Sequence, residues 1–451
     1  MPSDYDNDLL REAVFNIKTG DLTAARHYLE RALEVADDWD TRTEANFQMS
    51  QITDDPVEKR KYLEETLAIS PTHAEARRAL AILDGKLKPQ DIVDPDHLPA
   101  QSSDERNAAV DRFACPKCGA RMVFDGDGRT LICENCSRQD VLNPAAVQVE
   151  QDFIIAMANG QSQRKPVATN AFVCQGCGAR ALLPPQAISE TCSYCGSVYV
   201  LAGATELVEP DSIIPMAFNQ RDAALRLVQW VEKHKITPQG KIQAPRGLYL
   251  PVWTFDIMGN VPWHGVTYSS EMPGLGSGFG SAGPLSLSLG GSKYQNKQAR
   301  SVSGNRDVYS DDVIVPATSK LGDLFVKMLK EYTYSGAAAY DPRYLAGWPA
   351  EIYETAMAQA SLKARGQVAD DVAHNLGSWL SGEYSSLSDL GYSTGNLAVV
   401  SFKLVLVPVW VTEYELENRQ FRVLINGQNG AVHGETPSHG ILGWLDGVLG
   451  N

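Results

Sequence analysis

The sequence lacks any uninterrupted apolar run long enough to cross a membrane. Its longest apolar stretch, residues 396–411, is rich in valine but contains Lys403 and Pro408, whereas a spanning helix needs about 20 apolar residues. The first ten residues, MPSDYDNDLL, have neither the basic start nor the apolar centre of a secretion signal. These absences predict a protein with no membrane span and no signal peptide.

Basic residues are also in short supply. The 451 residues include 40 Lys and Arg against 55 Asp and Glu, which gives a formal net charge of -15. A chain with this balance is not attracted as a whole to nucleic acid or to anionic lipid. The acidity is concentrated at the start, because residues 1–105 carry 23 acidic and 12 basic side chains.

Motifs of catalysis are absent as well. No segment has the G-x-x-x-x-G-K-[ST] pattern of a P-loop, and neither H-E-x-x-H nor G-x-S-x-G occurs. Residues 278–283 fit G-x-G-x-x-G, but they lie in a Gly- and Ser-rich stretch followed by Pro284, not between a strand and a helix. The sequence therefore predicts no catalytic residue and no organic cofactor. An enzyme with an unrecognised site in the C-terminal part stays open as an alternative.

Cysteine is scarce, and all eight cysteines belong to two sets with the same spacing. Each set has two Cys-x-x-Cys pairs, and the second follows the first at an offset of 59 residues: Cys115, Cys118, Cys133 and Cys136, then Cys174, Cys177, Cys192 and Cys195. Such a spacing is typical of a zinc ribbon, in which four thiolates surround one Zn²⁺ tetrahedrally. We expect two structural zinc ions and, because thiolates need reducing conditions, a cytoplasmic location. Rubredoxin-like iron and redox-active cysteine pairs are the alternatives.

Glycine follows three of the four Cys-x-x-Cys pairs, as Gly119, Gly178 and Gly196, and Ser137 follows the remaining one. Glycine permits the tight turn that directs N–H groups at sulfur. A site closed by four protein ligands leaves no coordination position for a substrate. We therefore expect the two ribbons to hold shape without taking part in a reaction.

Nucleic-acid binding by the ribbons is a further alternative. Four basic residues near the cysteines could form a local patch: Arg112, Lys117, Arg121 and Arg180. Nucleic-acid binders usually present a basic face, but residues 110–205 contain eight basic and eight acidic side chains. Protein contacts are therefore the favoured use of the ribbon surfaces.

Residues 7–85 have the pattern of helical hairpins. Residues 28–33 (YLERAL) recur as residues 62–67 (YLEETL), at the 34-residue offset of a tetratricopeptide repeat. We expect a turn at Gly20 and Asp21. The repeat is imperfect, because Lys59 stands where a small residue would match Ala25. An ordinary helical bundle is the alternative, and both predict a protein-docking surface.

The remainder of the chain, after about residue 205, alternates helical and strand patterns. Helices are expected at 221–235, 318–332 and 349–375, strands at 247–258, 399–411 and 419–424, a hairpin turn at Asn426-Gly427, and a Gly-rich loop at 274–291. Glu351 is expected to open the third helix. The fold class is thus multidomain α+β, with a helical repeat domain at 1–88, a linker at 89–110, zinc ribbon 1 at 111–145, a helical connector at 146–170, zinc ribbon 2 at 171–204 and an α+β domain at 205–451.

Several stretches together resemble a known family. They are residues 115–120 (CPKCGA), 193–197 (SYCGS), 213–215 (IIP), 247–256 (GLYLPVWTFD), 344–348 (YLAGW), 406–410 (LVPVW) and 423–427 (VLING). The chain resembles, over roughly residues 111–437, the bacterial tandem (TFIIB-type) zinc-ribbon proteins, which are often labelled primosomal protein N′-like. The resemblance implies a zinc-binding protein without an assigned activity. Helicase activity is not carried over, because the chain has no P-loop.

The function expected from the sequence is that of a non-catalytic, zinc-binding adaptor or scaffold, which binds protein partners through its helical repeat domain. The alternatives are a nucleic-acid-associated protein that uses the ribbons, and an enzyme. The last residues place Ile441, Trp444, Leu445 and Val448 on one face of a short helix. Packing on the parent domain is the first interpretation of that face, and a partner groove or membrane surface is the second.

Overall fold

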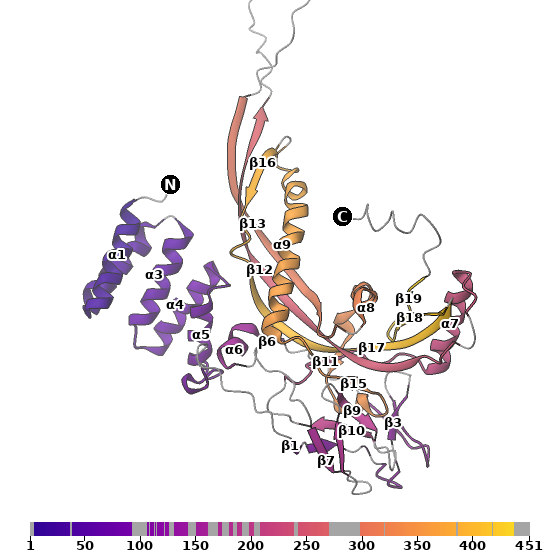
Figure 1. Cartoon of the computed structure of the whole chain (residues 1–451). Helices are drawn as coiled ribbons and strands as arrows, with labels where there is room; N and C mark the ends of the chain where they lie inside the picture. The colour runs from indigo at the N-terminus through magenta and orange to yellow at the C-terminus, as the bar shows by residue number, and fades with distance from the viewer. Residues whose placement is uncertain are drawn as a thin grey trace, which may run out of the picture. The chain divides into compact units, whose positions relative to one another are not determined.

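The structure is a computed structural model of the whole chain (Figure 1). It describes residues 4–36, 38–92, 106–107, 109–111, 113, 115–120, 122–125, 130–142, 150–160, 170–173, 180–183, 187–191, 198–202, 208–238, 242–269, 298–319, 321–384, 387–416 and 418–436. The chain forms two compact units. Unit 1 comprises residues 1–256, 311–364 and 399–451, and unit 2 comprises residues 257–310 and 365–398.

Five helices form the start of unit 1: α1 (Asp4–Thr19), α2 (Leu22–Val35), α3 (Trp39–Ile52), α4 (Pro56–Ile69) and α5 (Ala74–Leu83). Helices α2 to α5 each follow a residue whose side chain accepts a hydrogen bond from the first turn: Asp21, Asp38, Asp55 and His73. The expected helical region is thus confirmed, and α2 and α4 begin 34 residues apart. Gly20, with φ +86°, makes the expected turn between α1 and α2.

Short strands occupy the middle of the chain. Strands β3 (Met122–Phe124), β4 (Thr130–Cys133) and β5 (Gln139–Val141) form a three-stranded antiparallel sheet. Strands β7 (Asn170–Val173) and β8 (Arg180–Leu183) pair with each other, as do β9 (Ala187–Thr191) and β10 (Val198–Ala202).

The segment expected as a linker, residues 89–110, contains regular structure. It includes η1 (Pro89–Asp91), β1 (Arg106–Asn107) and the start of β2 (Ala109–Asp111). Strand β1 pairs with β7 and strand β2 pairs with β10. The chain before the first cysteine set is therefore paired with the strands around the second set.

A large mixed sheet organises the C-terminal part. Its path runs β14 (Ala338–Ala339), β11 (Ser212–Ile213), β17 (Ala398–Leu416), β12 (Arg246–Ser269), β15 (Ala350–Glu351), β9, β10 and β2. Strand β17 also pairs with β6 (Gln151–Asp152) and with β18 (Arg419–Asn426), which continues through a turn into β19 (Val432–Gly434). The strands expected at 399–411 and 419–424 and the hairpin at Asn426-Gly427 are confirmed.

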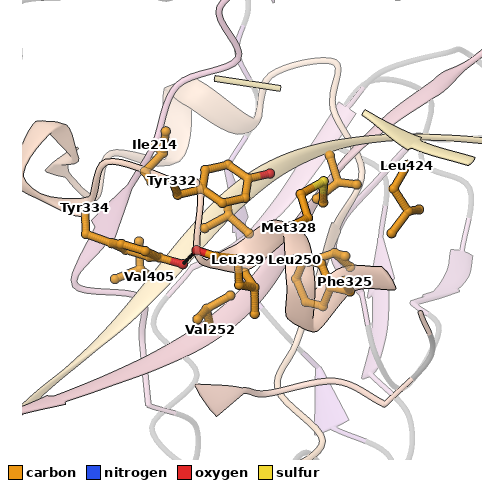
Figure 2. Packing of buried hydrophobic residues seen from close by; sticks show 12 residues of the cluster. Ile214, Leu250, Val252, Phe325, Met328, Leu329, Tyr332, Tyr334, Val405 and Leu424 are labelled. Atoms are coloured by element: carbon orange, nitrogen blue, oxygen red, sulfur yellow. Dashed lines mark hydrogen bonds between the residues drawn. The ribbon is translucent and has the colours of Figure 1, made fainter. Parts of the chain in front are cut away.

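Helix α8 (Gly322–Leu329) packs on this sheet. Figure 2 shows Phe325, Met328 and Leu329 of the helix among side chains of β12 and β17. The hydroxyl of Tyr334 donates to the Leu329 carbonyl oxygen at 3.1 Å, so the segment that follows the helix is held against its last turn. Burial of a side chain such as Phe325 contributes roughly 2–3 kcal/mol.

Helix α7 (Gln220–Lys233) begins at Asn219, whose side chain accepts from two N–H groups of the first turn. It buries Ala223, Leu227 and Trp230, as expected for an amphipathic helix. The Trp230 ring lies against Gly434 of β19, where a β-carbon would come within 2.3 Å of the ring. No larger residue fits at that position without movement of the helix.

Two helices begin later in the structure than the sequence predicts. Residues 349–356 are not helical: Ala350 pairs with Tyr249 of β12 and with Ser189 of β9, and α9 (Met357–Leu380) begins seven residues after Ala350. Glu351 therefore lies in β15 and does not open a helix. Helix α8 starts at Gly322 instead of residue 318. In the first case, pairing with strands distant in sequence overrides the local preference.

Unit 2 contains the part of β12 after Asp256, the part of β13 (Gln298–Pro316) up to Ser310, the end of α9 and β16 (Leu387–Tyr392). Trp263 is buried in this unit, and its ring meets Tyr384 edge to face at 5.3 Å. A β-carbon on Gly304 would lie 3.0 Å from Trp263. The expected Gly-rich loop at 274–291 and the apolar residues 441–448 lie outside the described residues.

In the part of the chain that the structure describes, no helix is both long enough and apolar enough to cross a bilayer.

Candidate metal centre

The first four cysteines come together at one end of the β3–β5 sheet, although they are spread over 22 residues. Cys115 and Cys118 lie in the turn before β3, Cys133 ends β4, and Cys136 lies in the turn between β4 and β5. Cys133 is opposite Met122 in the β3–β4 ladder, so this hairpin brings the second pair back to the first. We call residues 113–142 the first cysteine module.

The sulfur positions suit a single ion bound by four thiolates. The Sγ atoms of Cys115 and Cys136 are 3.6 Å apart, those of Cys118 and Cys133 are 3.5 Å apart, and all four lie within 4.8 Å of one another. A tetrahedral ion with bonds of about 2.3 Å to sulfur requires separations of about 3.8 Å. All four are free thiols and not disulfides. The four cysteines thus form a candidate metal site, and its geometry fits the zinc expected from the sequence.

The two cysteine turns have the same backbone geometry. The N–H of Gly119 donates to the Cys115 carbonyl at 2.8 Å, and the N–H of Ser137 donates to the Cys133 carbonyl at 3.0 Å. Gly119 has φ +71° and Ser137 has φ +53°, so both positions are left-handed. Ser137 therefore adopts the same turn that glycine makes elsewhere, at the cost of an unfavourable conformation for a residue with a β-carbon.

Substitutions at these two positions should have opposite effects. Gly119→Ala is expected to weaken metal retention about fivefold, because alanine is strained at this φ although its β-carbon would meet no other atom within 4 Å. Ser137→Gly should retain metal at least as well as the wild type, because it relieves the same strain. Competition with a chromogenic chelator measures both. Equal retention by wild type and Gly119→Ala would contradict the assigned turn geometry.

Neighbouring groups shift the pKa values of Cys118 and Cys136 in opposite directions. The N–H of Ala120 lowers the pKa of Cys118, and the Cys133 thiol adds to this effect. The N–H of Arg138 also lowers the pKa of Cys136, but burial and hydrogen bonds with the other thiols outweigh it and raise that pKa to about 11. Four thiolates so close together repel one another, and a bound cation offsets that repulsion.

The first cysteine module is anchored to the C-terminal part of unit 1 through Phe124. Its N–H donates to the Ala346 carbonyl at 2.8 Å, and its carbonyl accepts from Trp348 Nε1 at 3.2 Å. The Phe124 ring meets Tyr344 edge to face at 5.1 Å. Trp348 in turn lies on Gly247 of β12, where a β-carbon would come within 2.5 Å of the indole. These contacts connect the four-cysteine site to β12 of the large mixed sheet.

The second set, Cys174, Cys177, Cys192 and Cys195, lies outside the described residues. Along the sequence, Cys174 comes directly after β7, Cys177 lies between β7 and β8, Cys192 comes directly after β9, and Cys195 lies between β9 and β10. Each pair thus occupies the connection between two paired strands. A second metal site there stays a prediction.

A buried lysine forms a second group of charged residues, which the sequence patterns did not identify. Lys403 of β17 is only 6% exposed, and its Nζ lies 3.1 Å from Glu150 Oε1 and 3.2 Å from Asp312 Oδ1. Burial lowers the pKa of Lys403, but the two carboxylates raise it more. We call Glu150, Asp256, Asp311, Asp312 and Lys403 the Lys403 cluster. The one sequence signal for this cluster is a lysine in a valine-rich strand. Such a lysine indicates a charged partner, because a buried charge needs one.

Three carboxylates of the Lys403 cluster lie close enough to shift one another's pKa values. Oxygens of Glu150, Asp256 and Asp311 lie within 4.8 Å of one another. The hydrogen bond with Asp256 raises the pKa of Glu150, and burial adds to that shift. Burial raises the pKa of Asp256 too, but hydrogen bonds from Glu150 and Ser401 bring it below its usual value. Since the Lys403 ammonium already neutralises part of this charge, we assign no metal to these carboxylates.

Nearby contacts join the helical region to the same strand. Arg77 of α5 lies 2.8 Å from Asp152 Oδ2, and it also donates to the Val400 carbonyl of β17 at 3.1 Å. Asp152 caps α6 (Phe153–Ala158) and pairs with Ser401. Ala158 of this short helix packs against Ala81 of α5. The connector between the two cysteine sets thus contacts both α5 and β17.

Asp211, which precedes β11, should make stability depend on pH. Burial raises its pKa to about 6, although the Leu404 N–H and the Gln151 amide oppose the shift. A raised pKa means that the stabilising contribution is complete below the unfolded pKa of 3.8 and is lost as pH rises through 6. The free energy of unfolding of Asp211→Asn should therefore be compared with that of wild type at each pH. The difference should favour the variant by about 1–2 kcal/mol more at pH 7.5 than at pH 5. Urea unfolding at both pH values measures this difference, and a constant difference would contradict the assignment.

Comparison with known proteins finds one curated protein of similar sequence. The chain is 26% identical over 347 residues to a protein of Bacillus subtilis (strain 168) described as Uncharacterized protein YdjG, a match that covers 75% of this chain and 94% of YdjG. No family model matches the chain, and no solved structure matches it. The similarity extends over most of YdjG and assigns no activity, so membership of the tandem zinc-ribbon family stays a prediction.

Proposed function

We propose that the chain is a zinc-stapled adaptor, in which two closed Cys₄ zinc sites hold the middle of the molecule and the helical region binds a protein partner. The zinc assignment is supported by four free thiols whose separations suit a tetrahedral ion. The proposal predicts about two zinc ions per full-length chain. Elemental analysis of protein purified without added metal tests it, and a content near one would remove the second site.

The observation that carries the adaptor proposal is a set of exposed apolar side chains in the helical region. Four of them, one on each of α1 to α4, are 48–76% exposed: Phe15, Leu22, Trp39 and Val57. Such residues contribute little to folding where they are, but they contribute to binding when a partner covers them. Meanwhile α5 is fixed to the rest of unit 1 by Arg77 and Ala81, so a partner on α1 to α4 would be coupled to the sheet.

Affinity capture with the full-length protein tests the adaptor proposal. Partners retained by the wild type should be lost by a variant in which Phe15, Leu22, Trp39 and Val57 are all replaced by serine. Tyr309→Ser is the control, because Tyr309 is 62% exposed, within the 48–76% range of the four residues, but lies in unit 2. Capture of the same proteins by the fourfold variant, or of none by the wild type, would refute this function.

The two alternatives have no comparable support. Of the four basic residues near the cysteines, Arg112 and Arg121 lie outside the described residues, Lys117 is exposed, and Arg180 lies in β8. The Gly-rich segment considered for an enzyme also lies outside them. Salt-sensitive binding of single- or double-stranded DNA or RNA at low ionic strength would revive the first alternative.

A further inference from the structure

A pocket at one end of the helical region has an exposed tryptophan in its wall. The pocket has a volume of about 380 Å³ and is lined by Ala36, Trp39, Arg42 and Ile69. Trp39 is the first residue of α3 and is 70% exposed. Pockets that bind ligands have volumes of about 300–1,000 Å³, so this one has room for a large side chain.

Part of the apolar surface in this pocket is not covered by other side chains of the protein. Ala36 is buried directly after α2, whereas Ile69 at the end of α4 is only half-buried. Tryptophan is one of the residue types most enriched at the centres of protein interfaces. A ring that is exposed beside a pocket is therefore poised for a partner's side chain.

The electrostatics around the pocket favour a cation. Helices α2 and α4 both end there, and α4 has no basic residue in its last turn, so the negative dipole end of α4 is not compensated. Asp38 caps the positive end of α3 by accepting from the Thr41 N–H, whereas the carboxylate of Asp40 follows Trp39, and residues 1–58 contain 14 acidic and five basic side chains. Arg42 supplies one positive charge, but its guanidinium donates to the Ala36 carbonyl at 3.4 Å.

We propose that this pocket, the Trp39 pocket, binds a basic segment of a protein partner. One large aliphatic or aromatic side chain of the segment packs against Trp39 and Ile69, and flanking Lys or Arg side chains meet the end of α4 and the carboxylate of Asp40. The proposal rests on the adaptor function and names the chemistry of its partner. The sign of the charge selects against nucleic acid and anionic lipid at this surface.

Selection from a random peptide library displayed on phage, panned against the full-length protein, tests the proposal. The selected peptides should combine a large apolar residue with flanking Lys or Arg. Synthetic, fluorescein-labelled copies should bind at least tenfold more weakly to Trp39→Ala than to wild type, and Asp40→Lys should weaken them as well. Binding should also weaken as NaCl is raised towards about 0.5 M. Trp39→Ala should fold normally, because so little of the side chain is buried, and circular dichroism checks this.

Leu362→Ala is the matched control, because Leu362 is 69% exposed, close to the 70% of Trp39, but lies on α9 and not in the helical region. It should bind the peptides like wild type. The proposal is overturned by peptides without basic residues, by no selection at all, or by equal binding to Trp39→Ala. If Trp39→Ala still captures the cellular partners that the fourfold variant loses, the pocket proposal fails while the adaptor function stands.

Discussion

Removal of the metal from the first cysteine module is expected to unfold residues 113–142 and to release Trp348 from Phe124. The β3–β5 sheet is too small to be stable by packing alone, and binding of a structural zinc ion supplies on the order of 10 kcal/mol in small modules. Without it, the hydrogen bonds from Phe124 to Ala346 and from Trp348 to Phe124 lose their rigid partner.

Cys133→Ser tests this expectation without a chelator. Hydrogen–deuterium exchange should become fast not only at residues 113–142 but also at residues 341–349, which contact the module through Phe124. Val141→Ser is the matched control, because Val141 is an exposed residue of β5 that is not a ligand. If Cys133→Ser retains a full metal content and wild-type exchange, the four-cysteine site is wrong.

Loss of the buried ammonium in the Lys403 cluster should have the second large effect. Lys403→Met keeps much of the side-chain volume but leaves Glu150 and Asp312 facing each other without a cation, beside Asp256 and Asp311. Removal of one partner of a buried ion pair costs about 3–5 kcal/mol. We expect a loss near the lower end, about 3 kcal/mol at pH 7.5, because Glu150 is partly exposed and therefore screened.

The pH dependence distinguishes charge from packing. Without Lys403, the pKa values of the neighbouring carboxylates should rise on folding, so the variant should recover stability relative to wild type as pH falls towards 5. Asp312→Asn in the Lys403→Met background should also recover part of the loss. Lys363→Met, at an exposed position of α9, is the control and should be neutral. A pH-independent loss measured by urea unfolding would show that only packing was disturbed.

Features that depend on short stretches of sequence were predictable. The spacing of Cys115, Cys118, Cys133 and Cys136 indicated that their thiols meet, because two tight turns and one hairpin suffice to bring them together. The 34-residue offset between α2 and α4 was also visible, because it reflects side chains that pack between helices adjacent in the sequence. Local chemistry and local structure agree in these regions, and sequence patterns are most reliable there.

Features that depend on distant parts of the chain were not predictable. Glu150 and Lys403 are 253 residues apart, and nothing near either one indicates the other. Residues 349–356 have a local pattern compatible with helix, but Ala350 is held between Tyr249 and Ser189, which come from two other parts of the sequence. Long-range pairing of this kind is decided by the whole sheet, which a single sequence does not reveal.

The pairing of β2 with β10 has a consequence for the order of events during synthesis. Asp111 is opposite Val200 and Ala109 is opposite Ala202, so each partner emerges from the ribosome about 90 residues later. At about 5–20 residues per second, β2 waits on the order of 10 s with its edge unpaired. Cys115 to Cys136 emerge early in that interval. The first cysteine module is therefore expected to bind its metal and fold before β10 is available to pair with β2.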